Sequence, residues 1–345
     1  MLPDVLVYDD PSFENHVVPE GHPESPRRLL AARDGIALFE CMGTANVVRR
    51  AAPATGTNSL LRVHSQGHVE RLLGMDGETH NLDGETHVSP GSVAAALRAA
   101  GGAEALALSL LAGEARFGVS IGRPPGHHAT RESAMGFCLL NNVAVAAAAA
   151  RVSGAERVLV LDWDAHHGNG TQDIFYSDPS VLYVSLHNER AWPFTGKPDQ
   201  VGAGDGVGMN VNISIPAGSG DDTFEEAFRR LVSPVVRQFD PSIVLVSAGF
   251  DSYRGDPVGG FALSPGAFRR MAFSLLLSVS DKCPVGLVLE GGYDLAGLAA
   301  SLHHALRGLA SGTERVAPSS LAPAAEEALA RVEKSVSPWW ALELD

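Results

Sequence analysis

The order of secondary-structure signals along the chain is what most constrains its fold. Short runs of β-branched and other apolar residues alternate with Ala- and Leu-rich stretches of helical length. Strands that are apolar on both faces and separated by helices are typical of a parallel sheet covered by helices on each side. The predicted strands are 5–9, 117–121, 157–164, 181–187, 209–215, 242–251 and 285–294, and the predicted helices are 26–39, 90–112, 140–152, 222–238, 264–280 and 295–309.

Two parts of the chain differ in composition. Residues 1–312 contain no internal repeat and no Ser/Gly-rich linker, so we predict that they form one domain. Residues 313–345 are rich in Ala and Glu and end in "SPWWALELD". We predict that they form a helix and a tail that dock on the domain through the tryptophans, and a disordered extension is the alternative.

The termini, the cysteines and the hydropathy predict a cytoplasmic protein. The start, "MLPDVLVYDD", carries acids where a signal peptide needs basic residues. No run approaches the roughly 18 apolar residues that a membrane span requires. The three cysteines lie far apart and form no CxxC pair, which is typical of reduced thiols.

The chain is acidic, with a formal net charge of −14. This charge argues against direct binding of nucleic acid. It favours the approach of a cationic substrate, such as a lysine-bearing peptide or a polyamine. An acidic surface also keeps a protein soluble, and that simpler explanation remains open. A homo-oligomer is compatible with the sequence.

Chemically reactive side chains follow four of the predicted strands. In open parallel sheets, ligands bind at the carboxyl ends of the strands, so we expect these segments to meet at one edge. The segments are "GRPPGHHA" after 117–121, "DWDAHHGNG" after 157–161, "SAGFDSYRGDP" after 242–247 and "LEGGYDL" after 285–289.

Three of these side chains have the pattern of a catalytic metal site. Asp164 and His166 are two residues apart, so at an extended strand end they point to the same side. Asp251 ends another strand. Two carboxylates and one imidazole leave a fourth position open, as in catalytic zinc sites, and without cysteine ligands Fe²⁺ or Co²⁺ also fit. Each residue alone could be a helix cap or a core histidine, but the combination favours a metal.

Two further groups suit proton transfer and the binding of an oxyanion. His127 and His128 are adjacent in a Pro/Gly-rich loop, so one can face a reacting atom while the other supports it. Asp162 and Asn169 are candidates to fix their tautomers. Tyr293 in "EGGYD" can donate a hydrogen bond to a developing oxyanion. A surface loop and an ordinary turn are the alternatives for the two segments.

With these residues assembled, the sequence resembles the histone deacetylase and acetylpolyamine amidohydrolase superfamily over roughly residues 5 to 310. "DWD" and "HHGNG" are similar to its class II branch, in which Asn stands at position 169. The motifs that match in order are "GHPESPRRL", "RPPGHHA", "MGFCLLNNVAVAA", "DWDAHHGNGTQDIFY", "YVSLH", "SAGFDSYRGDP" and "LEGGYDL".

The resemblance implies an arginase-like three-layer α/β/α fold with a single, mainly parallel sheet of about eight strands, and makes 1–312 a deacetylase catalytic domain. It assigns zinc to the two aspartates and the histidine named above. It makes His128, paired with Asn169, the general base that later protonates the leaving amine. His127, paired with Asp162, is an electrostatic supporter, and Tyr293 polarises the amide carbonyl.

The resemblance also implies the surroundings of the reaction. Gly136, Phe137 and Trp192 match positions that line an acyl-lysine tunnel, and Phe194 replaces the usual glycine after the proline. Arg28 matches an arginine near an internal acetate channel. A structural potassium ion is implied beneath the zinc. Its ligands are Asp162, Ser185 and the main-chain carbonyls of Asp164, His166 and Leu186.

The substrate is the least constrained part of the prediction. Val258 stands where polyamine-preferring relatives of the class II branch carry an acid, which favours acyl-lysine over acylated polyamine. Asp83 and Glu85 lie where the family grips the substrate backbone at the rim. We expect a zinc amidohydrolase acting on acetylated or otherwise acylated lysines or small amines. An arginase-type enzyme with two manganese ions and a catalytically silent acyl-lysine binder are the alternatives.

Overall fold

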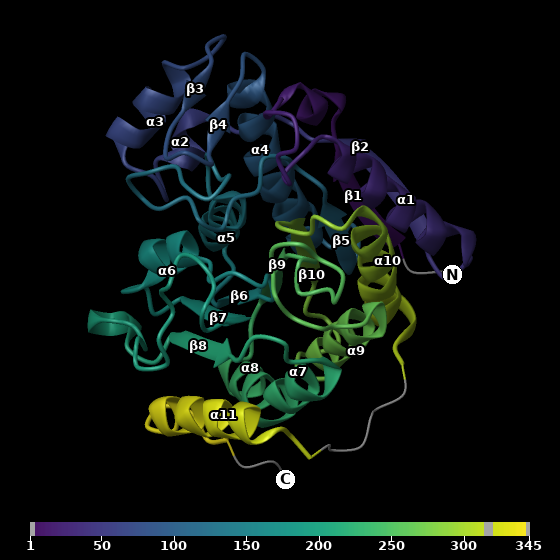
Figure 1. Cartoon of the computed structure of the whole chain (residues 1–345), viewed down its shortest axis with the longest axis vertical. Helices are drawn as coiled ribbons and strands as arrows, with labels where there is room; N and C mark the ends of the chain where they lie inside the picture. The colour runs from purple at the N-terminus through teal and green to yellow at the C-terminus, as the bar shows by residue number, and fades with distance from the viewer. Residues whose placement is uncertain (1–3, 314–319, 343–345) are drawn as a thin grey trace.

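The computed structural model describes residues 4–313 and 320–342 and contains one large sheet flanked by helices (Figure 1). The sheet has eight strands in the order β2-β1-β5-β10-β9-β6-β7-β8, and every pairing in it is parallel. The predicted fold class is therefore confirmed. The strands are β1 (Asp4–Asp9), β2 (Asn46–Ala51), β5 (Phe117–Ser120), β6 (Val158–Asp162), β7 (Val181–Asn188), β8 (Asn210–Ile215), β9 (Ile243–Ala248) and β10 (Val285–Leu289), with a separate antiparallel pair β3 (His80–Asn81) and β4 (His87–Val88).

Side chains of the central strands alternate between two apolar layers. Along β6, Leu159 and Leu161 point into one hydrophobic cluster, whereas Val158 and Val160 point into the other. Helices α4 and α5 supply the second cluster, and α1, α9 and α10 supply the first. The longer helices are α1 (Arg27–Cys41), α3 (Gln66–Leu73), α4 (Ser92–Leu111), α5 (Asn142–Val152), α9 (Pro265–Leu276), α10 (Leu295–Ser311) and α11 (Pro323–Val336).

Two local differences from the sequence prediction have clear physical causes. Strand β2 was not expected, because this edge strand is only partly buried and lacks an apolar run. The helix expected over 222–238 is divided into α7 (Asp221–Ala227), a π-helical turn (Phe228–Val232) and α8 (Ser233–Phe239). Pro234 has no amide hydrogen to continue the α-helical bonding pattern, and the wider turn absorbs that loss.

The expectation that no segment approaches a membrane span is wrong for helix α4. Its 20 residues are long and apolar enough to cross a membrane by length and composition. In the fold, however, 67% of the relevant window is buried, and α4 packs against α5 and the sheet. Composition alone therefore does not distinguish this core helix from a span.

The C-terminal segment lies along the β8 side of the molecule (Figure 1). Trp340 is buried, and its Nε1 donates a hydrogen bond to the carbonyl oxygen of Gly208 (2.8 Å). Trp339 is 42% exposed. Arg230 forms ion pairs with Glu326 and Glu333 of α11. The rest of the predicted tail, 343–345, and residues 314–319 lie outside the described residues.

Candidate metal centre and active site

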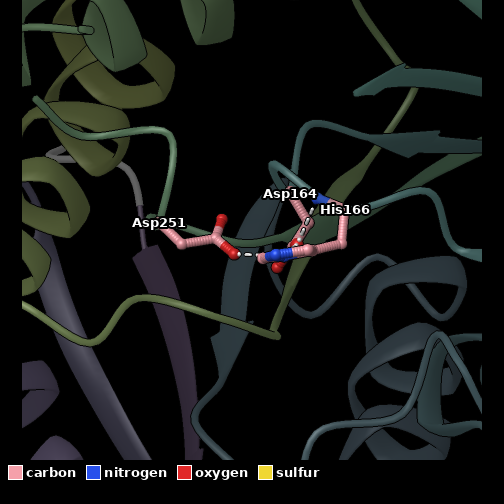
Figure 2. Close-up of side chains that lie close together, drawn as sticks. All are labelled: Asp164, His166 and Asp251. Carbon is pink, nitrogen blue, oxygen red and sulfur yellow. Dashed lines mark hydrogen bonds and ion pairs between the residues drawn. The ribbon is translucent and has the colours of Figure 1, made fainter. Parts of the chain in front are cut away.

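Asp164, His166 and Asp251 converge at the carboxyl end of the sheet (Figure 2). Asp164 and His166 follow β6, Asp251 follows β9, and these two strands are neighbours. One ligand atom from each residue lies within 4.8 Å of the others. His166 Nδ1 lies 2.8 Å from Asp251 Oδ2 and 3.2 Å from Asp164 Oδ1. The structure thus brings together the three residues that the sequence singled out as metal ligands.

The surrounding backbone fits a cation held by this cluster. Asp164 Oδ2 accepts a hydrogen bond from the Gly291 amide, and Asp251 Oδ1 accepts one from the Ala165 amide, each at 2.8 Å. A β-carbon at Gly291 would lie 2.6 Å from Asp164 Oδ2, and one at Gly249 would lie 2.0 Å from the same atom. Because only glycine leaves this space, the chain is built to admit two carboxylates side by side.

The charges of the cluster also call for a cation. Burial, together with the neighbouring charge of Asp164, raises the pKa of Asp251 to about 7. Burial would also raise the pKa of Asp164, but His127 and His166 outweigh it and hold that pKa below its usual value. Two almost inaccessible carboxylates this close are costly unless a cation offsets them. The donor set of two carboxylates and one imidazole suits a divalent ion with an open position.

Each histidine of the loop after β5 has the partner that the sequence suggested. His127 Nδ1 donates to Asp162 Oδ2 (3.0 Å), and His128 Nδ1 donates to Asn169 Oδ1 (2.9 Å). The two rings are 4.0 Å apart, and the His128 ring is 6.2 Å from that of His166. Because Asn169 Oδ1 can only accept, the proton of neutral His128 sits on Nδ1, and its Nε2 is left as a base.

The pKa values of the two histidines are shifted in opposite directions. Burial would lower the pKa of His127, but Asp162, Asp164 and Glu290 outweigh it and raise that pKa to about 10. The pKa of His128 is well below its usual value, first because of burial and then because of the positive His127 and His166. A charged imidazole therefore lies beside a neutral one, which separates an electrostatic role from a proton-accepting role.

Tyr293 lies just beyond β10, where the strand has ended. Burial raises the pKa of its hydroxyl well above the usual value, so the hydroxyl remains a hydrogen-bond donor. The Arg28 guanidinium lies 5.0 Å from the tyrosine ring centroid, and the Phe137 ring lies 6.0 Å away. Arg28 Nε donates to the carbonyl oxygen of Gly292 (2.7 Å). Its other hydrogen-bond partners include the Glu290 carbonyl oxygen.

Aromatic side chains border these groups. The Trp192 ring lies 4.7 Å from the His128 ring, and a β-carbon at Gly136 would lie 2.5 Å from Trp192. Phe137 has a positive φ of 68° and contacts Tyr293, as described above. The predicted lining residues Gly136, Phe137 and Trp192 therefore do lie around His128 and Tyr293.

The residues predicted to lie at the rim differ in burial and in hydrogen bonding. Asp83 accepts hydrogen bonds from the amides of Gly136, Glu85 and Thr86, so it is tied to the lining segment through its carboxylate. Glu85 is exposed. Val258 is 39% exposed, and its amide is bound by Asp256.

The residues expected to bind potassium lie on β6, on β7 and in the segment after β6 that carries two of the proposed metal ligands. Asp162 and Ser185 are paired positions on β6 and β7. Asp162 Oδ2 also accepts from the Tyr183 hydroxyl (2.9 Å). Within residues 4–313 and 320–342, neither the Asp164 nor the His166 carbonyl oxygen accepts a hydrogen bond, and Leu186, which follows Ser185 on β7, is buried. Unpaired carbonyls in buried surroundings are suited to a monovalent cation.

Sequence reasoning missed the contacts of two acids near the site. Glu290 Oε2 accepts from the amides of Gly126 (2.7 Å) and His127 (3.1 Å), and it thereby holds the histidine loop against β10. An acid directly after the apolar run "VGLVL" was the available signal. Asp256 lies in a loop and is partly buried, and its carboxylate accepts hydrogen bonds from four backbone amides, including that of Tyr293.

A second missed feature lies behind Tyr293. Glu24 is fully buried between two arginines, and its Oε1 accepts from Arg28 (2.9 Å) and Arg123 (2.5 Å). Burial would raise the pKa of Glu24, but Arg123 above all holds it far below the usual value. "GHPESPRRL" contains two of the three residues, although the sequence does not show that Arg123 completes the group.

Comparison with known proteins identifies the family of this chain. The family model described as histone deacetylase domain matches residues 22–309. A histone deacetylase-like amidohydrolase of Pseudomonas aeruginosa is 39% identical over 286 residues, which cover 80% of this chain and 73% of that protein. The human protein named polyamine deacetylase HDAC10 is 39% identical over 312 residues, which cover 86% of this chain and 45% of that protein.

A solved structure is similar over almost the whole chain. The crystal structure of the HDA15 HD domain has a TM-score of 0.89 and 35% sequence identity, and the match covers 98% of this chain and 95% of that one. The chain spans about half the length of several curated relatives that it matches. The relatives bear the names of deacetylases and amidohydrolases, so the predicted class of amide hydrolase is confirmed at the level of the family. The chain belongs to the histone deacetylase family.

Proposed function

We propose that this protein is a zinc-dependent amidohydrolase that removes acetyl or other short acyl groups from lysine side chains or similar amines. The observation that carries the proposal is the convergence of the metal cluster with a neutral His128 and a protonated Tyr293. An ion held by Asp164, His166 and Asp251 would supply Lewis-acid polarisation and lower the pKa of water.

The proton transfers are assigned to His128. Its Nε2 is the basic nitrogen, because Nδ1 donates to Asn169. It takes a proton as water attacks the amide carbonyl and later delivers that proton to the nitrogen of the leaving amine. His127 stays charged between Asp162 and Asp164, so it stabilises negative charge without itself giving up a proton.

The hydroxyl of Tyr293 is assigned to the carbonyl oxygen of the substrate. Negative charge develops on that oxygen during attack, and a fixed donor is worth more there than in the ground state. The raised pKa of Tyr293 keeps the donor protonated. Phe137 and Trp192 are proposed to line the passage for the apolar stem of the acylated amine, with Gly136 between them.

Two substrate classes follow from this arrangement. An acyl-lysine in a peptide or protein is the first, because Val258 contributes an apolar side chain to the loop that Asp256 joins to the Tyr293 amide, and Asp83 holds the amide of the lining residue Gly136. An acylated polyamine or another small amide is the second. The acidic charge of the chain and the name of the human relative favour it.

The remaining alternatives are less well supported. An enzyme with two metal ions would need further free Asp or His ligands near Asp251, but the nearby Asp256 carboxylate is taken up by four amides. The described residues form one group with metal-ligand geometry. A catalytically silent acyl-lysine binder would have no use for the paired histidines and the tyrosine.

We propose a potassium ion on Asp162, Ser185 and the carbonyl oxygens of Asp164, His166 and Leu186. The free carbonyls of Asp164 and His166 support that assignment. The proposal also includes Fe²⁺ or Co²⁺ as metals that could replace zinc, a cytoplasmic location and a homo-oligomeric state. It does not include direct binding to nucleic acid or to a membrane.

The test is a comparison of substrates by the same enzyme preparation. Rates are measured on a fluorogenic acetyl-lysine peptide, longer acyl-lysine peptides, acetylputrescine and acetylspermidine, with and without a chelator and with metal restored. Deacylation that the chelator abolishes and zinc restores supports the proposal. Binding of acetyl-lysine without turnover on any substrate would contradict it, and the ratio of rates decides between the lysine and polyamine classes.

A further inference from the structure

We propose that Asp256 is a positioning residue for Tyr293: its carboxylate fixes the main chain that carries the tyrosine hydroxyl. The inference rests on the proposed function, because it concerns the donor that acts on the substrate carbonyl. It assigns a role to a side chain that does not itself reach the reacting atoms.

The carboxylate bridges two separate chain segments. Asp256 Oδ2 accepts from the amides of Tyr293 (2.6 Å) and Asp294 (3.0 Å). Its Oδ1 accepts from the amides of Val258 (3.0 Å) and Gly259 (3.3 Å). Hydrogen bonds from amides to an ionised carboxylate are stronger than bonds between neutral groups. One side chain therefore clamps the segment of Tyr293 to the loop around Val258.

The main chain at Tyr293 has no regular structure to hold it. Strand β10 ends at Leu289, and α10 begins at Leu295 with Asp294 as its N-cap. Gly292 has a φ of 119°, which breaks the strand geometry. Amides just before a helix have no partner within that helix, so another group must bind them. For Tyr293 and Asp294, that group is the Asp256 carboxylate.

The loop around Val258 and Gly259, which Asp256 also binds, packs against the metal cluster. A β-carbon at Gly259 would lie 2.1 Å from the carbonyl oxygen of Asp251, so the loop packs directly on the backbone of a proposed metal ligand. The Gly259 carbonyl oxygen accepts from Asn188 Nδ2 (3.3 Å). Asp256 thus links the proposed metal site to the proposed oxyanion donor through one carboxylate.

Contacts of the tyrosine ring do not replace this link. Arg28 lies over the ring face and Phe137 lies at 6.0 Å, edge to face, so both contact the ring and neither binds the amides of Tyr293 and Asp294. A misplacement of about 1 Å in a catalytic group can cost roughly 10²-fold in rate. Asp256→Asn removes one of the two acceptor atoms while keeping the side-chain shape. We expect kcat to fall 10- to 100-fold with KM changed less than threefold.

The experiment compares Asp256→Asn, Tyr293→Phe and the double variant on the fluorogenic acetyl-lysine peptide. A residue that acts through Tyr293 has no further effect once the hydroxyl is gone, so the double variant should match Tyr293→Phe. Metal content should remain that of the wild type. The matched control is Asp178→Asn, which alters a loop carboxylate that binds the Ser180 amide before the amino end of β7, and its kcat should be unchanged.

A second readout does not depend on turnover. Hydrogen–deuterium exchange of the peptide spanning 291–297 should be faster in Asp256→Asn, because the amides of Tyr293 and Asp294 lose their ionised acceptor, and unchanged in Asp178→Asn. Unchanged exchange, loss of metal, a kcat within threefold of the wild type, or an additive double variant would overturn the role of Asp256. A wild-type enzyme without activity would instead reject the proposed function, and the exchange result would still decide whether Asp256 holds Tyr293.

Discussion

The guanidinium of Arg28 lies 5.0 Å from the ring centroid of Tyr293 and is fully buried beneath it. The same arginine donates to the carbonyl oxygen of Gly292, so it supports both the ring and the main chain of the tyrosine. Neither contact uses the tyrosine hydroxyl. The ring is held as a unit, and the hydroxyl is left for another partner.

Tyr293→Phe should therefore lower the catalytic rate without changing the stability of the fold. Phenylalanine keeps the ring over Arg28, so the melting temperature and metal content should stay at wild-type values. Only the donor to the oxyanion is lost, and we expect turnover to fall about 10²- to 10³-fold. Steady-state kinetics on the acetyl-lysine peptide provides the measurement. Near-normal turnover would remove Tyr293 from the mechanism.

Glu24→Gln should lower stability strongly. Glu24 is the shared partner of Arg28 and Arg123, and all three side chains are inaccessible to solvent. Breaking a buried ion pair from one side typically costs about 3–5 kcal/mol, because a charge is left without a partner. Denaturant unfolding measures this loss. The control Glu40→Gln, from an exposed pair with Arg49, should leave the unfolding free energy unchanged, and equal effects would contradict the assignment.

His64 should make the protein sensitive to acid. Burial lowers the pKa of its imidazole to about 3 from a usual 6.5. The unfolded chain binds this proton below pH 6.5 and the folded chain does not, so stability is lost as pH falls from 6.5 towards 3. The loss from this one group should reach about 2 kcal/mol at pH 5. Unfolding curves of His64→Asn should show a correspondingly smaller decline with acid, and an unchanged slope would exclude His64.

Trp340→Ala should destabilise the protein more than Trp339→Ala. Trp340 is buried and donates to Gly208, whereas Trp339 is half exposed. Removing a buried aromatic side chain costs about 3–5 kcal/mol. Thermal unfolding of both variants tests whether the C-terminal segment docks through this residue. Equal and small effects would show that the docking contributes little.

The sequence predictions agree with the structure where a local pattern of residues determines the secondary structure or the position of a side chain. The central strands are visible in the sequence because both faces are buried, as along Val158–Asp162. Asp164, His166 and Asp251 could be grouped because parallel strands bring their carboxyl ends together. Edge strand β2 lacks that signal, since its side chains are half exposed and include Arg49 and Arg50.

The features that were missed depend on distant partners. Asp256 binds amides up to 38 positions away, and Glu290 binds amides more than 160 positions away. Nothing in the residues around an aspartate in a loop shows which amides the fold will bring to it. Arg123 likewise meets Glu24 only because the strand order places their segments together.

The central claim is that one divalent ion is held by Asp164, His166 and Asp251. The most direct measurement is elemental analysis of dialysed wild-type protein and of Asp251→Ala after both are supplied with zinc. We predict one zinc ion per wild-type chain and, in the variant, loss of the ion together with a lower melting temperature, since binding energy contributes to folding. Two ions per wild-type chain, or an unchanged zinc content in Asp251→Ala, would contradict the account.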